Sequence, residues 1–155
     1  MRKVFIFFMA MALFFINVSI SKAYEEEVIW RFAEKHEYGD VEPTELAYIS
    51  MDKNILLIHW KCAGDPESIE IYKINKKNKN STCATKIRSY MIDDDNQRFV
   101  INNDREAMNN RRNICVRITN KKLTLDSLVF KKQKGLLINI FPKEILEQYF
   151  NRKYD

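Results

Sequence analysis

A short stretch in which apolar and polar residues alternate places the strongest constraint on how this chain can fold. The stretch is NICVRIT, residues 113–119, in which every second residue, Ile114, Val116 and Ile118, is apolar. Successive side chains of a β-strand point to opposite faces of the sheet. This alternation therefore predicts an antiparallel strand with one face in a core and the other in water.

Segments of strand length, rich in β-branched and aromatic residues, recur along the chain with turn signals such as 63–66 and 93–96 between them. Six or seven such strands predict a mainly β domain, an antiparallel sandwich or small barrel, with its core over about residues 47–141. The predicted strands are 54–62, 68–74, 82–92, 98–101, 113–119, 123–130 and 135–141. The predicted core residues are Leu56, Ile58, Trp60, Ile114, Val116, Ile118, Leu123 and Leu125.

Two short helices are predicted to flank the strands. In residues 25–38, apolar residues recur at helical spacing behind three glutamates, which favour a helix N-terminus. Near the other end of the chain, Pro142 suits the first turn of a helix. The terminal helix is predicted over about 142–151, with Ile145 and Leu146 in its apolar stripe.

The N-terminus carries an uncharged apolar run, Val4 to Ile20, behind Arg2 and Lys3. Residues 1–23 are accordingly interpreted as a membrane-targeting segment. A cleaved signal peptide fits the small residues of Ser21-Lys22-Ala23. An uncleaved signal anchor fits the length of the run, which is close to the lower limit of about 17 residues for a membrane span. Both interpretations place residues 24–155 across the membrane, as a periplasmic or secreted domain.

The charge of the exported part argues against nucleic-acid binding. The chain has 26 Lys and Arg residues, of which Arg2, Lys3 and Lys22 belong to the targeting segment. The remaining 23 basic residues face 21 acidic residues, so the net charge of the exported part is only +2. That balance is typical of an ordinary soluble surface, and we expect no direct contact with nucleic acid.

All three cysteines, Cys62, Cys83 and Cys115, belong to the exported part. In an oxidising compartment two of them are expected to form a disulfide, and one remains. The sequence does not say which two pair. The remaining thiol is either buried as a small apolar group or available to bond a partner chain. Their spacing matches no metal site.

The two histidines, His36 and His59, are the candidate pH-sensing residues, because histidine titrates between about pH 5 and 8. The simpler interpretation is that both are packed or surface residues without such a role. No nucleophile, general base or cofactor motif accompanies them, so the sequence favours binding or regulation over an enzyme, and no catalytic residue, metal or cofactor is expected.

The layout of the chain resembles that of a known family. It begins Met1-Arg2-Lys3, continues with one hydrophobic segment, and ends in a small cysteine-containing exported domain. This organisation is similar to that of the MyfF/PsaF-type inner-membrane accessory proteins, and it is ToxS-like. The resemblance implies a single-pass protein of the cell inner membrane, N-terminus in the cytoplasm and bulk in the periplasm. It implies no particular site residue.

The resemblance also implies a function and a partner. Such an accessory protein stabilises or tunes a membrane-bound regulator, a membrane-embedded transcription activator, and so promotes the expression of surface fibrillae. The alternative from another class is a secreted or periplasmic binding protein, such as an immunity protein or an enzyme inhibitor. Cleavage of the apolar segment would favour the alternative, and its retention would favour the accessory protein.

Overall fold

In the computed structural model, the protein is described over residues 25–34, 45–62 and 66–154, and within these ranges it is mainly β. The strands are β1 Glu27–Glu34, β2 Glu45–Asp52, β3 Ile55–Cys62, β4 Ser68–Lys77, β5 Ser81–Asp93, β6 Arg98–Ile101, β7 Asn113–Ile118, β8 Lys122–Leu125 and β9 Leu128–Gly135. The helices are α2 Arg105–Asn109, the 3-10 turn η1 Leu137–Asn139 and α3 Lys143–Phe150.

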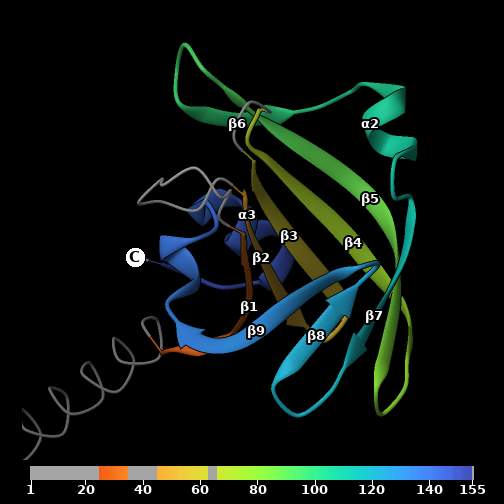
Figure 1. Ribbon diagram of the computed structural model, residues 1–155. Coiled ribbons are helices and arrows are strands. Elements are labelled where there is room, and N and C mark those ends of the chain that lie inside the picture. The colour runs from red at the N-terminus through yellow and green to blue at the C-terminus, as the bar shows by residue number, and fades with distance from the viewer. Residues whose placement is uncertain (1–24, 35–44, 63–65, 155) are drawn as a thin grey trace, which may run out of the picture.

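Eight of these strands form a closed antiparallel barrel (Figure 1). Each strand from β1 to β5 pairs with the next, β5 pairs with β7, and β8 and β9 follow. The ring closes where β9 pairs with β1, with Lys132 opposite Trp30. Among the described strands, β6 pairs only with β5, along the last part of that strand, and it lies outside the ring. The predicted mainly β architecture is confirmed, and of the two predicted forms it is the barrel.

The barrel interior is filled by the inward-facing residues of the strands. Six of the predicted core residues are fully or almost fully buried there: Leu56, Ile58, Ile114, Val116, Leu123 and Leu125. Tyr72 and Phe130, which were not predicted, are the largest fully buried side chains of this cluster. Trp60 and Ile118 pack against this cluster but are only half-buried, because each lies near an end of the barrel.

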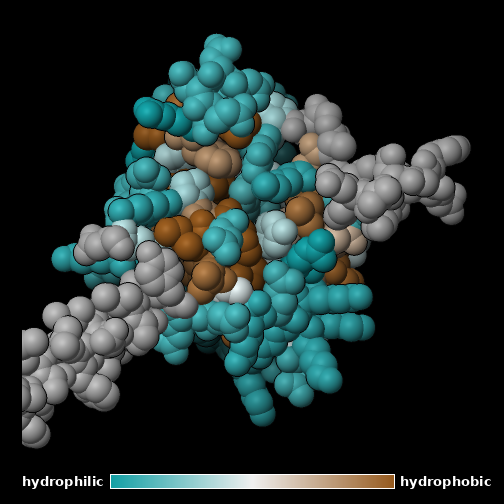
Figure 2. Space-filling view, turned by 90° about the vertical axis from the view of Figure 1, so that its left-hand side faces the viewer, coloured by the Kyte–Doolittle hydropathy of each residue, from teal (hydrophilic) through white to brown (hydrophobic). Residues whose placement is uncertain are grey.

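A second apolar cluster lies outside the barrel, between the outer face of β1–β4 and the C-terminal part of the chain. On the sheet side it contains Ile29, Leu57 and Ile71, and on the other side Phe141 and Leu146. Figure 2 views the molecule from this side, where apolar side chains gather in the middle of the face. The predicted terminal helix is confirmed as α3, and it covers strands that would otherwise expose an apolar face.

The helix predicted over residues 25–38 is wrong, because residues 27–34 form strand β1. The apolar residues that suggested helical spacing belong to two different apolar clusters, one inside the barrel and one outside it. Ile29 points outward into the cluster under α3, and Trp30 points into the barrel. A strand covered on both faces carries adjacent apolar residues, and β-branched and aromatic residues suit it.

The strands predicted over 123–130 and 135–141 are also wrong in detail. The first is divided into β8 and β9 by a tight turn at Asp126, whose φ of 52° is left-handed. The segment 131–134, which lies between these two predicted strands, continues β9. At Gly135 the chain leaves the barrel, and Leu137 opens η1. A side chain at Gly135 would lie 3.1 Å from the Ile29 side chain, so the close approach at this exit favours glycine.

The predicted membrane-targeting segment, residues 1–23, lies outside the described residues. Among the helices that the structure describes, none is long and apolar enough to span a membrane.

We expect Phe130→Ala to lower the free energy of unfolding by about 3–5 kcal/mol, because it empties a fully enclosed site in the barrel core. The neighbouring Val129, with 45% of its surface exposed, provides the matched control, and Val129→Ala should change stability by less than about 0.5 kcal/mol. Urea unfolding followed by tryptophan fluorescence measures both variants. Equal losses in the two would contradict the assignment of inward and outward faces on β9.

Candidate functional site

The upper end of the barrel in Figure 1 holds a pocket, and we call this end the mouth. The pocket has a volume of about 380 Å³ and opens to solvent. Its apolar walls come from Phe32 on β1, Trp60 on β3 and Leu128 on β9. Its polar side comes from Glu70 on β4 and from Arg111, in the loop that joins α2 to β7. Strands far apart in the sequence thus meet at one concave site.

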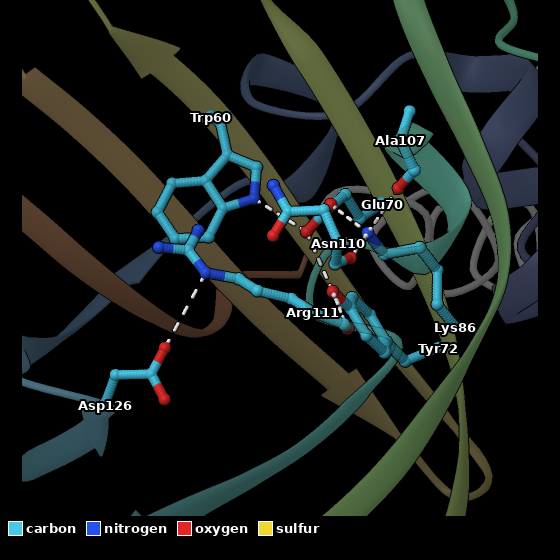
Figure 3. A network of polar contacts seen from close by, with 8 residues as sticks. All are labelled: Trp60, Glu70, Tyr72, Lys86, Ala107, Asn110, Arg111 and Asp126. Carbon is cyan, nitrogen blue, oxygen red and sulfur yellow. Dashed lines mark hydrogen bonds and ion pairs between the residues drawn. The ribbon is translucent and has the colours of Figure 1, made fainter. Parts of the chain in front are cut away.

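The carboxylate of Glu70 is the centre of the polar cluster (Figure 3). One oxygen pairs with the Lys86 ammonium group. The other accepts a hydrogen bond from Trp60 Nε1 at 2.8 Å and lies 2.9 Å from the Tyr72 hydroxyl. Burial, together with this carboxylate, raises the pKa of Tyr72 well above its usual range. The phenol therefore stays protonated and remains a hydrogen-bond donor.

Lys86 brings a positive charge into the barrel from β5, and its side chain is completely buried. Besides the Glu70 carboxylate, its ammonium group donates to the backbone carbonyls of Ala107, at 3.0 Å, and Asn110. An ammonium group has three protons, so these three acceptors satisfy it. Because the two carbonyls belong to α2 and the residue after it, Lys86 fastens this helical segment over the mouth.

Arg111 extends this cluster to the surface of the pocket. Its φ of 48° is left-handed, which is uncommon for a residue other than glycine. The turn places its carbonyl 3.2 Å from the Tyr72 hydroxyl, while its guanidinium lies 4.5 Å from the centre of the Trp60 ring. Asp126 on the β8–β9 turn is 3.6 Å from Arg111 Nε. The mouth therefore presents a cation stacked on an indole, held by a buried polar cluster.

The predicted disulfide is present and joins Cys83 on β5 to Cys115 on β7. The two residues are direct partners in the pairing of these strands, on their outward faces. The bridge therefore ties two neighbouring strands of the barrel wall. Cys62, which is outside this disulfide, is half-buried at the end of β3 and lines the mouth pocket.

Of the two candidate pH-sensing residues, His36 lies outside the described residues, and His59 is buried on the outer face of β3. His59 Nδ1 is 2.6 Å from the Ile140 carbonyl oxygen, and Nε2 is 2.6 Å from Glu67 Oε1. Glu67 also pairs with Lys61 at 3.2 Å. His59 thus connects the barrel wall to the C-terminal segment, on the face away from the mouth pocket.

Burial is the main influence on the charge of His59, and it lowers the pKa of the imidazole. The Ile140 carbonyl and the Glu67 carboxylate oppose this effect because both accept hydrogen bonds. Only the protonated ring can donate to both acceptors at once, since a neutral imidazole carries one N–H. A change in the protonation of the His59 imidazole therefore alters its hydrogen bonding to the Ile140 carbonyl of the C-terminal segment or to Glu67.

Sequence reasoning missed Glu70, Lys86 and Arg111. Glu70 lies in the segment SIEIYKI, where Ile69 and Ile71 flank it, and the outward burial of those two residues under the C-terminal segment turns Glu70 inward. A carboxylate between two isoleucines of a strand is a signal that could have found it. Lys86 and Arg111 offer no comparable local signal, because their positions depend on long-range pairing.

Among the described residues, no group of three or more His, Cys, Asp or Glu side chains is arranged to hold a metal ion. No protein family, curated protein or solved structure with which the chain was compared matches it. The chemistry of the mouth therefore rests on its own geometry: a pocket with an aromatic wall, and a cation above a carboxylate that three donors already engage.

We expect Lys86→Met to lower the free energy of unfolding by about 3–5 kcal/mol, because it leaves the Glu70 carboxylate in the barrel without its cation. The double variant with Glu70→Gln removes both charges, so it should recover part of that loss. Urea unfolding of the two variants and the wild type measures the difference. If the single variant were as stable as the wild type, the buried ion pair would have no structural role.

Acidification should weaken the fold through His59. Because the fold holds the pKa of His59 below its ordinary 6.5, the unfolded chain takes up the proton first, and stability should fall as the pH drops below that value. Urea unfolding at a series of pH values from about 7.5 to 5 measures this effect. In His59→Gln the decline should be shallower over the same range. A parallel decline in both proteins would exclude His59 as the responsible group.

Proposed function

We propose that this chain is an exported binding protein that serves as an accessory to a membrane-embedded transcription activator and so promotes the expression of surface fibrillae. The apolar run Val4 to Ile20 and the family resemblance in layout motivate the cellular role. The observation that carries the binding role is the mouth pocket, with its aromatic wall and its stacked Arg111.

The mouth suits a small amphipathic ligand. Its volume of about 380 Å³ lies at the lower end of the range of ligand pockets, roughly 300–1,000 Å³. Phe32, Trp60 and Leu128 offer contact to an apolar body, and Arg111, whose side chain is 39% exposed, offers a cation to a polar or anionic group. An eight-stranded barrel has an interior just wide enough for side chains to fill or for one small ligand. Side chains fill the interior here, so the proposed ligand site is the pocket at the mouth.

The contact with the activator is proposed to lie at β6. Within the described residues β6 ends the sheet, so the edge that faces away from β5 has no strand beside it. Val100 and Ile101 are 43% and 44% exposed on this strand. An open edge with apolar side chains is a template for strand addition by another chain. The exported part of the activator is the proposed occupant.

The second candidate is a secreted or periplasmic immunity protein or enzyme inhibitor. The same open edge of β6 favours it, because strand addition serves any protein target. The two candidates differ in what the partner is and in whether the apolar N-terminal segment is retained. Loss of activator from cells that lack this protein is expected only for the accessory role.

We expect deletion of this protein to lower the abundance of the activator, and the double variant Val100→Lys with Ile101→Lys to fail to restore it. The control is Val129→Lys, which places one lysine at a similarly exposed position on β9 of the barrel ring. Immunoblots of the activator and expression of the fibrilla genes measure both. Circular dichroism of the purified variants shows whether the barrel is intact.

Three outcomes of this experiment are distinct. If deletion leaves activator level and fibrilla expression unchanged, the accessory role is wrong and the immunity or inhibitor candidate replaces it. If both the β6 variant and the Val129 control restore the activator, the role stands but the contact is elsewhere. In the same assay, the single variants Cys62→Ser and His59→Gln test the two candidate sensing groups. Loss of the activator with either variant would show that the Cys62 thiol or the His59 imidazole takes part in stabilising the activator.

A further inference from the structure

The end of the barrel opposite the mouth, the lower end in Figure 1, is here called the base. In an up-and-down barrel alternate turns lie at the same end, so the base gathers turns 53–54, 78–80 and 119–121. Hydrogen bonds join these turns to neighbouring strands, from Ile118 N to the Asn80 carbonyl at 2.8 Å and from Lys132 N to the Lys121 carbonyl at 3.1 Å.

The base is strongly basic. Ten lysines at this end are exposed, and Figure 2 shows hydrophilic side chains projecting from the lower end of the molecule. They are Lys53, Lys73, Lys76, Lys77, Lys79, Lys121, Lys122, Lys131, Lys132 and Lys134. Four carboxylates lie at the same end. Glu27 and Asp52 pair with Arg152 at 3.0 and 3.7 Å, and Glu25 and Glu26 precede β1. The lysines outnumber these carboxylates by more than two to one, so the base keeps a net positive charge.

The interior of the barrel ends at the base in apolar side chains. Met51, Ile74 and Ile118 are half-buried there and close the core toward this end. Val28, at the start of β1, is 39% exposed. An apolar centre surrounded by flexible lysines is the pattern of a surface that rests on lipid headgroups, where lysine stems cover apolar area and their ammonium groups reach phosphates.

We propose that the base of the barrel docks on a bilayer surface that contains anionic phospholipid. Charge complementarity supports this occupant. The course of the chain supports it too. β1 begins at the base, and the apolar run Val4 to Ile20 precedes β1 in the sequence. The inference does not rest on the ligand or the activator proposed above. In this orientation the mouth and β6 point away from the membrane.

The contact should depend on both lipid charge and salt. Each lysine near an anionic surface strengthens binding by about fivefold, and the attraction falls off within a Debye length of about 8 Å at physiological salt. Several lysines at one end therefore act together, whereas scattered lysines elsewhere on the domain do not. Lys61 and Lys143 are exposed outside the base and serve as internal references.

The test uses the chain of residues 1–155 on vesicles of phosphatidylcholine alone or with one part in three of phosphatidylglycerol. An amine-reactive reagent labels the lysines, and mass spectrometry measures the rate at each. The proposal expects Lys79 and Lys121 to react several-fold more slowly on the anionic vesicles, and about 0.5 M salt to abolish the difference. Lys61 and Lys143 should react equally on both vesicles.

A matched pair of double variants completes the test. Lys121→Gln with Lys122→Gln should reduce the protection of Lys79, whereas Arg98→Gln with Arg105→Gln, which removes the same charge outside the base, should leave it unchanged. Equal labelling rates on the two kinds of vesicle would overturn the proposal. So would equal protection by a DNA duplex, because the base would then be a general polyanion surface rather than a lipid-docking one.

Discussion

The pairing of β9 with β1 is the interaction on which the rest of the structure depends. It runs from Glu27 opposite Gly135 to Arg31 opposite Lys131 and joins the first described strand to the last. Closure gives every strand of the ring a neighbour on both sides, which removes the exposed edges of an open sheet. It also fixes which side chains are enclosed. The outward set on β1–β4 is apolar as well, so the chain must continue past Gly135 to cover it.

An enclosed interior makes the charges beneath the mouth costly, and hydrogen bonds to the buried polar side chains offset that cost. Among the described residues, every buried side-chain nitrogen or oxygen has a hydrogen-bond partner. The ammonium group of Lys86 has three acceptors. They are the Glu70 carboxylate, the Ala107 carbonyl in α2 and the carbonyl of Asn110, the residue after α2. Such a cluster stabilises one arrangement of the loop above it, because any other arrangement leaves a buried charge unpaired. Arg111 is held over Trp60 for this reason.

Local patterns predicted most of the strands, including β3, which is covered on both faces, but they failed at β1. The alternation of residues 113–119 predicted β7 correctly, since its outward side chains meet solvent. β1 was mistaken for a helix because Ile29 and Trp30 enter different cores and stand side by side in the sequence. The meeting of Glu70 with Lys86 depends on a register shift between β4 and β5 beside Tyr72. No local pattern encodes that shift, so the mouth could not be predicted.

The strand β5 connects the two surfaces that the proposed function requires. Its middle carries Lys86, which holds the loop of the mouth, and its last residues pair with β6, whose open edge is the proposed protein contact. Cys83 near its start fixes it to β7 by the disulfide, so the strand is anchored at one end. A ligand that displaces Arg111 from Trp60 would act on the loop that Lys86 fastens. This loop contacts β5 through Lys86 and β4 through Tyr72. Coupling between the proposed ligand and the proposed partner therefore has a direct route along β5. The last part of this strand pairs with β4 and β6, and its Tyr90 hydroxyl lies 3.1 Å from the Tyr149 hydroxyl of α3.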